Sequence, residues 1–263
     1  MLALRRPAGQ FARVGHRGAS ALAPENSLEA LQLAVELGCD MLEFDVLDLV
    51  DGTVVLVHEL RRSERREGLG ALRARTPRLA TLDEALAFCA RELPGIGLQV
   101  DLKRRGLERA VVDALRRHAV FERSWVSTFD AGSLRRIGEL APDLPRSYTL
   151  PRDRLGVSKR GPLAPVVRGA LASLGASLPR RLPALLQRSR ADAFTLHHSL
   201  ASPAAIARAH ELGAPVYVWT VDDPALAERL VRAGADGIIT NDPRVLPGLS
   251  AGSVFASSSL PGF

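Results

Sequence analysis

The sequence predicts an α/β fold, a single TIM-type (β/α)8 barrel with a short insertion after the second strand. Its length of 263 residues fits one such barrel, which takes about 250 residues. Short apolar segments alternate along the chain with longer amphipathic ones, and eight of these strand-then-helix units follow one another. Repeated βα units imply a parallel sheet, and eight of them indicate a closed barrel.

The first two units carry the clearest signals. The apolar segment 11–15 is expected to be a strand, and 26–38 is expected to be a helix because its leucines and valine recur at helical spacing before Gly38. The next strand, 39–46, is followed by an Asp51-Gly52 turn and by "TVVLVH" (53–58), which extends it or pairs with it.

The remaining units repeat this alternation. Helix 81–92 opens with Thr81 and Glu84, the capping-box pattern. The other strands are expected at 96–102, 124–128, 146–150, 193–196, 215–221 and 236–240, and the other helices at 107–120, 133–141, 203–213, 224–234 and near 243–248.

Three stretches depart from this rhythm. Residues 59–80 are rich in Arg, Glu and Gly and show no clear strand or helix, and 151–190 is longer than one helix needs. Loops of that size in a compact domain are usually functional or mobile. The Ser/Gly/Ala-rich residues 249–263 are expected to be a disordered tail, which leaves 1–248 as the catalytic barrel domain.

Composition narrows the classes of partner. The formal net charge is +6, and nearly all positive charge is arginine, since lysine occurs only at Lys103 and Lys159. That charge is typical of a solvated surface or of attraction to phosphate-bearing ligands. Aromatic residues make up only 5% and no recognition motif accompanies the charge, so we expect no nucleic-acid partner.

Membrane and targeting signals are weak. No run approaches the roughly 18 apolar residues of a membrane span, and the start of the chain has no apolar signal-peptide core, so we expect a cytoplasmic protein without stable membrane insertion. Peripheral contact with a membrane stays open, because "VSKRGPLAPVVRGALASLG" (157–175) is both basic and apolar. The oligomeric state also stays open.

Charged and polar residues are concentrated at the carboxyl ends of the expected strands, where barrels of this kind carry their active sites. Glu43 and Asp45 share one face of a buried strand, because strand side chains alternate. Two carboxylates placed so close repel each other unless a cation or a set of donors neutralises them. Asp101 ends the next barrel strand, and three carboxylates suit a hard divalent cation, Mg²⁺ or Ca²⁺.

Other polar side chains end neighbouring strands. His16 and Arg17 end the first strand, His58 ends the extra strand, and Lys103 follows Asp101. Trp219 ends the seventh strand, where it is either part of the core or an apolar platform for a ligand. A single buried carboxylate is more often an ion-pair partner, and a single histidine is more often structural. The convergence of these residues at one end of the barrel favours a functional site.

The motifs resemble those of the glycerophosphodiester phosphodiesterase family. The opening "GHRGASALAPENSLEAL" (15–31) is similar to the family's HRG…PENT segment, and "GCDMLEFDVLDLVDGTVVLVHE" (38–59) to its E-x-D-V…DG…V-x-H-D segment. The later motifs follow in the family's order, and the resemblance spans about 11–247. They are "LQVDLK" (98–103), "VSTFD" (126–130), "VYVWTVDD" (216–223) and "GADGIITNDP" (234–243).

The resemblance implies a metal-dependent barrel enzyme that hydrolyses glycerophosphodiesters, small-molecule substrates, to an alcohol and sn-glycerol 3-phosphate. His16 and His58 match its acid–base histidines, and the metal carboxylates match Glu43, Asp45 and Asp101. Arg17 and Lys103 match positions near the phosphate, and Trp219 matches the aromatic residue near the glycerol. The family usually has Glu where this chain has Asp101, and Asp where it has Glu59.

Two alternatives stay open at this point. One is a lysophospholipase D-like phosphodiesterase that acts on lipids, which needs an exposed apolar rim on 59–80 or 151–190. The other is a barrel that binds its ligand without catalysis, for which the shortened Asp101 is the argument.

Overall fold

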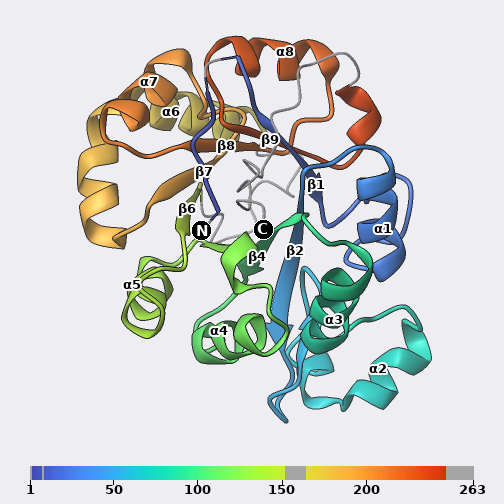
Figure 1. The fold of residues 1–263 in the computed structure, drawn as a ribbon. Coiled ribbons are helices and arrows are strands. Elements are labelled where there is room, and N and C mark those ends of the chain that lie inside the picture. Colours follow the sequence, from blue (N-terminus) through green and yellow to red (C-terminus); the bar gives the residue numbers. More distant parts are fainter. Residues whose placement is uncertain (1, 8, 152–163, 247–263) are drawn as a thin grey trace, which may run out of the picture.

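The strands of the computed structural model form the predicted barrel (Figure 1). The structure describes residues 2–7, 9–151 and 164–246. Eight parallel strands close into a ring because β1 pairs with both β2 and β9, and β3 adds to β2 as an antiparallel neighbour. The strands are β1 Ala12–His16, β2 Met41–Asp48, β3 Val54–Leu56, β4 Gly97–Leu102, β5 Ser124–Thr128, β6 Arg146–Leu150, β7 Ala193–His197, β8 Val216–Trp219 and β9 Gly237–Thr240.

Helices surround the barrel and bury the outward faces of its strands (Figure 1). The predicted capping box of α3 is present, with the Thr81 and Glu84 side chains each accepting from the other's backbone N–H. None of the helices in the described part of the chain has the length and apolar character that a membrane crossing requires. The helices are α1 Leu28–Glu36, α2 Leu69–Arg75, α3 Leu82–Glu92, α4 Glu108–Arg117, α5 Ala131–Leu140, α6 Ala164–Ser189, α7 Pro203–Glu211 and α8 Pro224–Arg232.

The segment after the second strand differs from the sequence prediction. Residues 59–80 were expected to lack regular structure, but they contain a 3₁₀ turn at Glu64–Arg66 and the helix α2. Leu72 of α2 is buried with Val55 and Leu79, so packing against β3 stabilises a helix whose sequence has few periodic apolar positions. Strand β3 ends at Leu56, so His58 follows the strand by two residues and does not end it.

The second irregular stretch is also more regular than expected. Within 151–190, the described residues form the single long helix α6, although it contains Pro179 and Pro183. The short final helix expected near 243–248 is a 3₁₀ turn at Pro243–Val245. The expected tail at 249–263 lies outside the described residues, as do 152–163.

The interior of the barrel changes character from one end to the other. At the amino ends of the strands the inward side chains are apolar, and Trp125 and Tyr217 lie there with ring centroids 4.6 Å apart. A Cβ on Gly237 would lie 2.2 Å from the Tyr217 ring, so only glycine leaves room for this side chain. A middle layer of small polar groups follows, in which Gln99 donates to Ser127. The charged side chains come last, at the carboxyl ends.

Candidate active site

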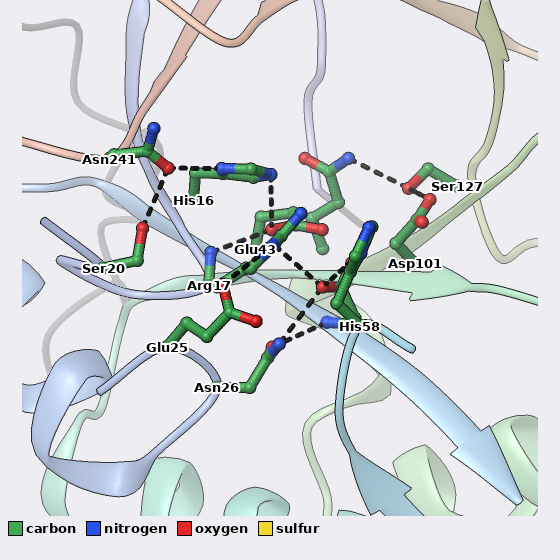
Figure 2. A network of polar contacts seen from close by, with 12 residues as sticks. His16, Arg17, Ser20, Glu25, Asn26, Glu43, His58, Asp101, Ser127 and Asn241 are labelled. Atoms are coloured by element: carbon green, nitrogen blue, oxygen red, sulfur yellow. Dashed lines mark hydrogen bonds and ion pairs between the residues drawn. The ribbon is translucent and has the colours of Figure 1, made fainter. Parts of the chain in front are cut away.

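The turn after β1 brings two backbone groups to the site. Arg17 has φ 55° and Gly18 has φ 79°, so the chain reverses at once after the strand. Glycine is required at position 18, because a Cβ there would lie 2.4 Å from the carbonyl carbon of Ala30. The Arg17 N–H donates to Glu43 Oε2 over 2.9 Å, and the Arg17 carbonyl accepts from the Asn26 N–H. The turn therefore fixes the position of Glu43 (Figure 2).

Three buried carboxylates converge from two neighbouring strands. In the register of β2 and β4, Asp45 lies opposite Asp101. Glu43 lies two residues before Asp45, so its side chain is on the same inward face of β2. One oxygen from each carboxylate lies within 4.8 Å of the others. Their exposed fractions are 4% for Glu43, 0% for Asp45 and 4% for Asp101. The structure thus brings together the three carboxylates that the sequence predicts as metal ligands.

Two cations lie against this cluster. Lys103 Nζ is 2.5 Å from Asp45 Oδ1 and 2.6 Å from Asp101 Oδ2, and Arg17 Nε is 2.9 Å from Asp45 Oδ2. Burial alone would raise the pKa of Asp45, but Lys103, His58 and Arg17 outweigh it and hold that pKa well below its usual range. The acidic neighbours likewise outweigh burial at Lys103 and raise its pKa.

Glu43 is a carboxylate whose ionised form is disfavoured by burial and by its acidic neighbours. Burial, and after it the charge of Asp45, raise the pKa of Glu43 well above its ordinary value. Two cations face three carboxylates, so with all three ionised the cluster would carry an excess of negative charge, which a proton on Glu43 or a bound cation would offset. Oxygen-only ligands with excess negative charge fit a hard divalent cation such as Mg²⁺ or Ca²⁺. The residues present therefore fit such an ion.

A histidine lies on either side of the acidic cluster (Figure 2). His16, at the end of β1, has Nε2 4.0 Å from Glu43 Oε2 and Nδ1 2.6 Å from Asn241 Oδ1. Burial, followed by the charge of Arg17, lowers the pKa of His16 to about 4, so its imidazole is neutral at neutral pH. His58 has Nδ1 3.1 Å from Asp45 Oδ2, and its side chain is 38% exposed.

An aromatic wall stands beside the charged groups. Trp219 is half-buried at the end of β8 and donates from Nε1 to the Thr195 carbonyl. The Phe129 ring makes an edge-to-face contact with Trp219 at 5.9 Å, and Lys103 Nζ lies 5.8 Å from the Phe129 centroid. Trp219 also makes an edge-to-face contact with His197. Trp219 is thus connected to the cluster through Phe129.

The sequence prediction did not assign roles to four of the residues that shape this site. Asn26 makes two hydrogen bonds to Asp45: its Nδ2 donates to Asp45 Oδ2, and its Oδ1 accepts from the Asp45 N–H. Ser127 donates to Asp101 Oδ1 over 2.6 Å. Asn241 bonds to His16, and Phe129 contacts Trp219. All four lie inside the motifs quoted above, so their membership in a motif was the available signal.

Comparison of the sequence with models of protein families identifies the family of this chain. The model of the glycerophosphoryl diester phosphodiesterase family matches residues 16–83 and 99–245. The chain belongs to this family. The match confirms the resemblance and, with it, the expectation of a phosphoric diester hydrolase.

Relatives match over most of their length. A glycerophosphodiester phosphodiesterase from Caldanaerobacter subterraneus subsp. tengcongensis is 27% identical over 257 residues, which cover 89% of this chain and 95% of the relative. Among solved structures, an Oleispira antarctica phosphodiesterase in complex with the product sn-glycerol-3-phosphate has a TM-score of 0.69 and 23% identity, covering 89% of this chain and 94% of that one. A glycerophosphodiester phosphodiesterase from Thermotoga maritima has a TM-score of 0.69 and 22% identity, covering 92% and 99%. These two structures share the fold.

Proposed function

We propose that this chain hydrolyses glycerophosphodiesters to an alcohol and sn-glycerol 3-phosphate, with a divalent cation, Mg²⁺ or Ca²⁺, and two acid–base histidines. The observation that carries the proposal is the placement of two imidazoles beside one acidic cluster. His16 Nε2 lies 4.0 Å from Glu43, and His58 Nδ1 lies 3.1 Å from Asp45. Family membership and the product-bound Oleispira antarctica structure support the same reaction.

The carboxylates and the basic side chains have separate roles in this proposal. Glu43, Asp45 and Asp101 would hold the cation, since one oxygen of each lies within 4.8 Å of the others. When bound, a divalent cation withdraws charge from a phosphoryl group and so stabilises the transition state. Arg17 and Lys103 add positive charge toward the non-bridging phosphate oxygens, because Asp45 holds both of them at the cluster. Asp101 also orients Lys103 through an ion pair.

The histidines move the protons. One imidazole accepts the proton of the attacking glycerol hydroxyl group while the other donates a proton to the leaving alkoxide, which gives a cyclic phosphate and the free alcohol. Water then opens the ring with the two roles exchanged and yields sn-glycerol 3-phosphate. Each such transfer typically contributes about 10²–10⁴-fold to the rate. In both rings Nδ1 bonds to a protein oxygen, on Asn241 or Asp45, so Nε2 is the nitrogen that meets the substrate.

Trp219 supplies an apolar surface. Its indole and the Phe129 ring meet edge to face beside Lys103, so an apolar wall adjoins the phosphate-binding charges. The carbon atoms of a glycerol group pack on such a wall while its phosphate faces Lys103 and Arg17.

The described part of the insertion gives no support to the lipid-specific alternative. A lipid substrate needs an exposed apolar rim, but Leu72 and Leu79 are buried against β3. Among the described residues, the large hydrophobic side chains with high exposure are Leu22 and Val50, and neither lies in 59–80. A water-soluble glycerophosphodiester is therefore the substrate to test first.

The test is release of sn-glycerol 3-phosphate from glycerophosphocholine and glycerophosphoethanolamine, in Mg²⁺, in Ca²⁺ and in EDTA. We expect release that depends on the metal. Release that persists in EDTA would contradict the metal role of the carboxylates. No release with either metal, from folded protein, would contradict the proposed substrate class. Release of choline from lysophosphatidylcholine would then support the lipid alternative, and its absence would support a barrel that only binds.

A further inference from the structure

Asn241 connects His16 to Asp222, an acidic residue outside the carboxylate cluster. Figure 2 shows the contacts of Asn241 with His16 and Ser20. Asn241 follows β9 directly, and its Oδ1 lies 2.6 Å from His16 Nδ1. The Ser20 hydroxyl donates to the same Oδ1 over 2.8 Å. On the other side, Asn241 Nδ2 donates to Asp222 Oδ2 over 2.6 Å.

The orientation of the Asn241 amide follows from the chemistry of Asp222. A carboxylate offers only acceptor atoms, so the amide NH₂ must face Asp222 and the amide oxygen must face His16. Asp222 is itself held in place, because its Oδ1 accepts from the Asn241 backbone N–H over 2.8 Å and from the Thr240 hydroxyl over 3.0 Å. The carboxylate therefore excludes the flipped amide.

The amide oxygen in turn selects the tautomer of His16. Which ring nitrogen of a neutral histidine carries the proton is set by the hydrogen bond that the other makes. An amide oxygen can only accept, so the Nδ1 that faces it must carry the hydrogen. Nε2, on the side of Glu43, is then the nitrogen with the free lone pair.

We propose that Asp222 and Asn241 are positioning residues that hold His16 as the Nδ1–H tautomer, with Nε2 turned to the site. The effect of this tautomer on catalysis rests on the proposed function, because in that reaction Nε2 of His16 is the atom that exchanges a proton with the substrate. The tautomer itself is independent of any reaction and can be measured without one.

The decisive variants alter the amide and then restore its chemistry. Asn241→Ala removes the acceptor from His16 Nδ1. Asn241→Asp places a second carboxylate against Asp222, where a 2.6 Å bond now lies, so repulsion turns the new side chain away and takes the acceptor from His16 Nδ1. Asn241→Asp with Asp222→Asn exchanges the two groups, so an amide donor again meets a carboxylate and an acceptor again faces His16. Asp223→Asn is the matched control, because Asp223 caps α8 and asparagine is an equally good cap.

Two readouts are needed, the His16 tautomer and kcat. The tautomer is read from ¹⁵N–¹H correlation spectra of protein labelled at histidine, with the His16 signals assigned by their loss in His16→Gln. We expect the Nδ1–H form in the wild type and in Asp223→Asn. In Asn241→Ala and Asn241→Asp we expect loss of that preference and a fall in kcat on the order of 10²-fold. The exchanged pair should regain the tautomer and most of the lost kcat.

The outcomes separate the two proposals. A wild-type His16 that carries its proton on Nε2, or an Asn241→Ala variant that keeps the Nδ1–H form, overturns the positioning role. If the tautomer shifts while kcat stays at the wild-type value, the tautomer of His16 does not affect catalysis, and that part of the proposal is overturned. If the wild type turns over no glycerophosphodiester and the tautomer still shifts as expected, the positioning role stands and the proposed function fails.

Discussion

The two ends of the barrel satisfy their buried polar groups in different ways. At the amino end, Asp236 accepts from the backbone N–H of Arg6, from His210 Nε2 and from the backbone N–H of Val216, over distances of 2.8–3.0 Å. At the carboxyl end, Glu43 lies among other carboxylates and its pKa is raised well above its usual range. Both carboxylate oxygens of Asp236 at the amino end are paired by hydrogen bonds, whereas the carboxyl end retains electrostatic repulsion that a bound cation would relieve.

The apolar packing shows the same contrast. Leu2 and Leu4 are buried against Trp125 and Tyr217, so the start of the chain closes the amino end of the barrel. The Tyr217 hydroxyl donates to the Leu4 carbonyl, which ties this segment to β8. At the carboxyl end, the half-buried Trp219 leaves an aromatic surface accessible. If this contrast is correct, substitutions at the two ends have separable effects on activity and on stability.

The largest effect is expected at the histidines of the carboxyl end. Alanine at His16 or at His58 should lower kcat by about 10²–10⁴-fold, because each removes a proton-transfer group. Circular dichroism should show an unchanged fold. His118→Ala is the control, since His118 caps α4 and bonds to Asp83 on the helical layer. Near-normal kcat in either site variant would contradict the assignment of that histidine.

The second prediction concerns the charge of Lys103 and asks whether the acidic cluster needs it for stability. Lys103→Met leaves Asp45 and Asp101 without an ion-pair partner that now lies 2.5–2.6 Å away. Breaking a buried ion pair by removing one partner costs about 3–5 kcal/mol, so the free energy of unfolding in EDTA should fall by that amount. Mg²⁺ or Ca²⁺ should raise the melting temperature of this variant more than that of the wild type, because the ion replaces the lost charge.

The matched control for Lys103 is its neighbour Arg104. Arg104 pairs with Asp48, and both side chains are partly exposed to solvent. Arg104→Met should therefore change the free energy of unfolding by at most about 1 kcal/mol. If Lys103→Met is as stable in EDTA as Arg104→Met, the buried cluster does not need the lysine charge.

A substitution at Leu4 tests whether the amino end of the barrel contributes to stability and not to activity. Leu4→Ala removes a buried side chain from the cluster that closes the amino end, and such a truncation costs about 2 kcal/mol or more. Urea unfolding should show this loss, while kcat and KM measured well below the melting temperature should match the wild type. A loss of activity without a loss of stability would show that the two ends are coupled.

The sequence allowed prediction of the barrel and of the acidic cluster, and the reason is periodicity. Alternation placed Glu43 and Asp45 on one face, and parallel pairing brought Asp101 opposite Asp45. It did not allow prediction of α2, whose seven residues depend on packing against β3 rather than on a periodic pattern. Nor does spacing reveal that Asn241 meets His16, because a contact across 225 residues depends on how the barrel closes.

The pairing of Lys103 with Asp45 shows the same limit. Family resemblance placed Lys103 near the phosphate and Asp45 among the metal ligands, as separate roles. In the structure they form one ion pair, because the register of β2 and β4 brings the end of one strand beside Asp45 of the other. Sequence motifs identify which residues belong to a site, whereas strand register determines which of them neutralise each other.

The smallest effect concerns pH at the carboxyl end. Burial, with a smaller contribution from His198, lowers the pKa of His197 from 6.5 to about 4. Between these values the unfolded chain binds a proton that the folded chain does not, so stability is full above pH 6.5 and falls as the pH drops toward 4. His197 is partly exposed, so we expect its contribution to be about 1 kcal/mol or less.

His197→Gln removes this titration while keeping a polar side chain beside Ser199, which His197 now contacts. Urea unfolding at neutral pH and at about pH 5 should show that the variant gains stability relative to the wild type on acidification. An equal difference at both pH values would mean that the His197 ring titrates alike in the folded and unfolded chains. The acid sensitivity of the carboxyl end would then come from other groups, and the contrast between the two ends would rest on the acidic cluster.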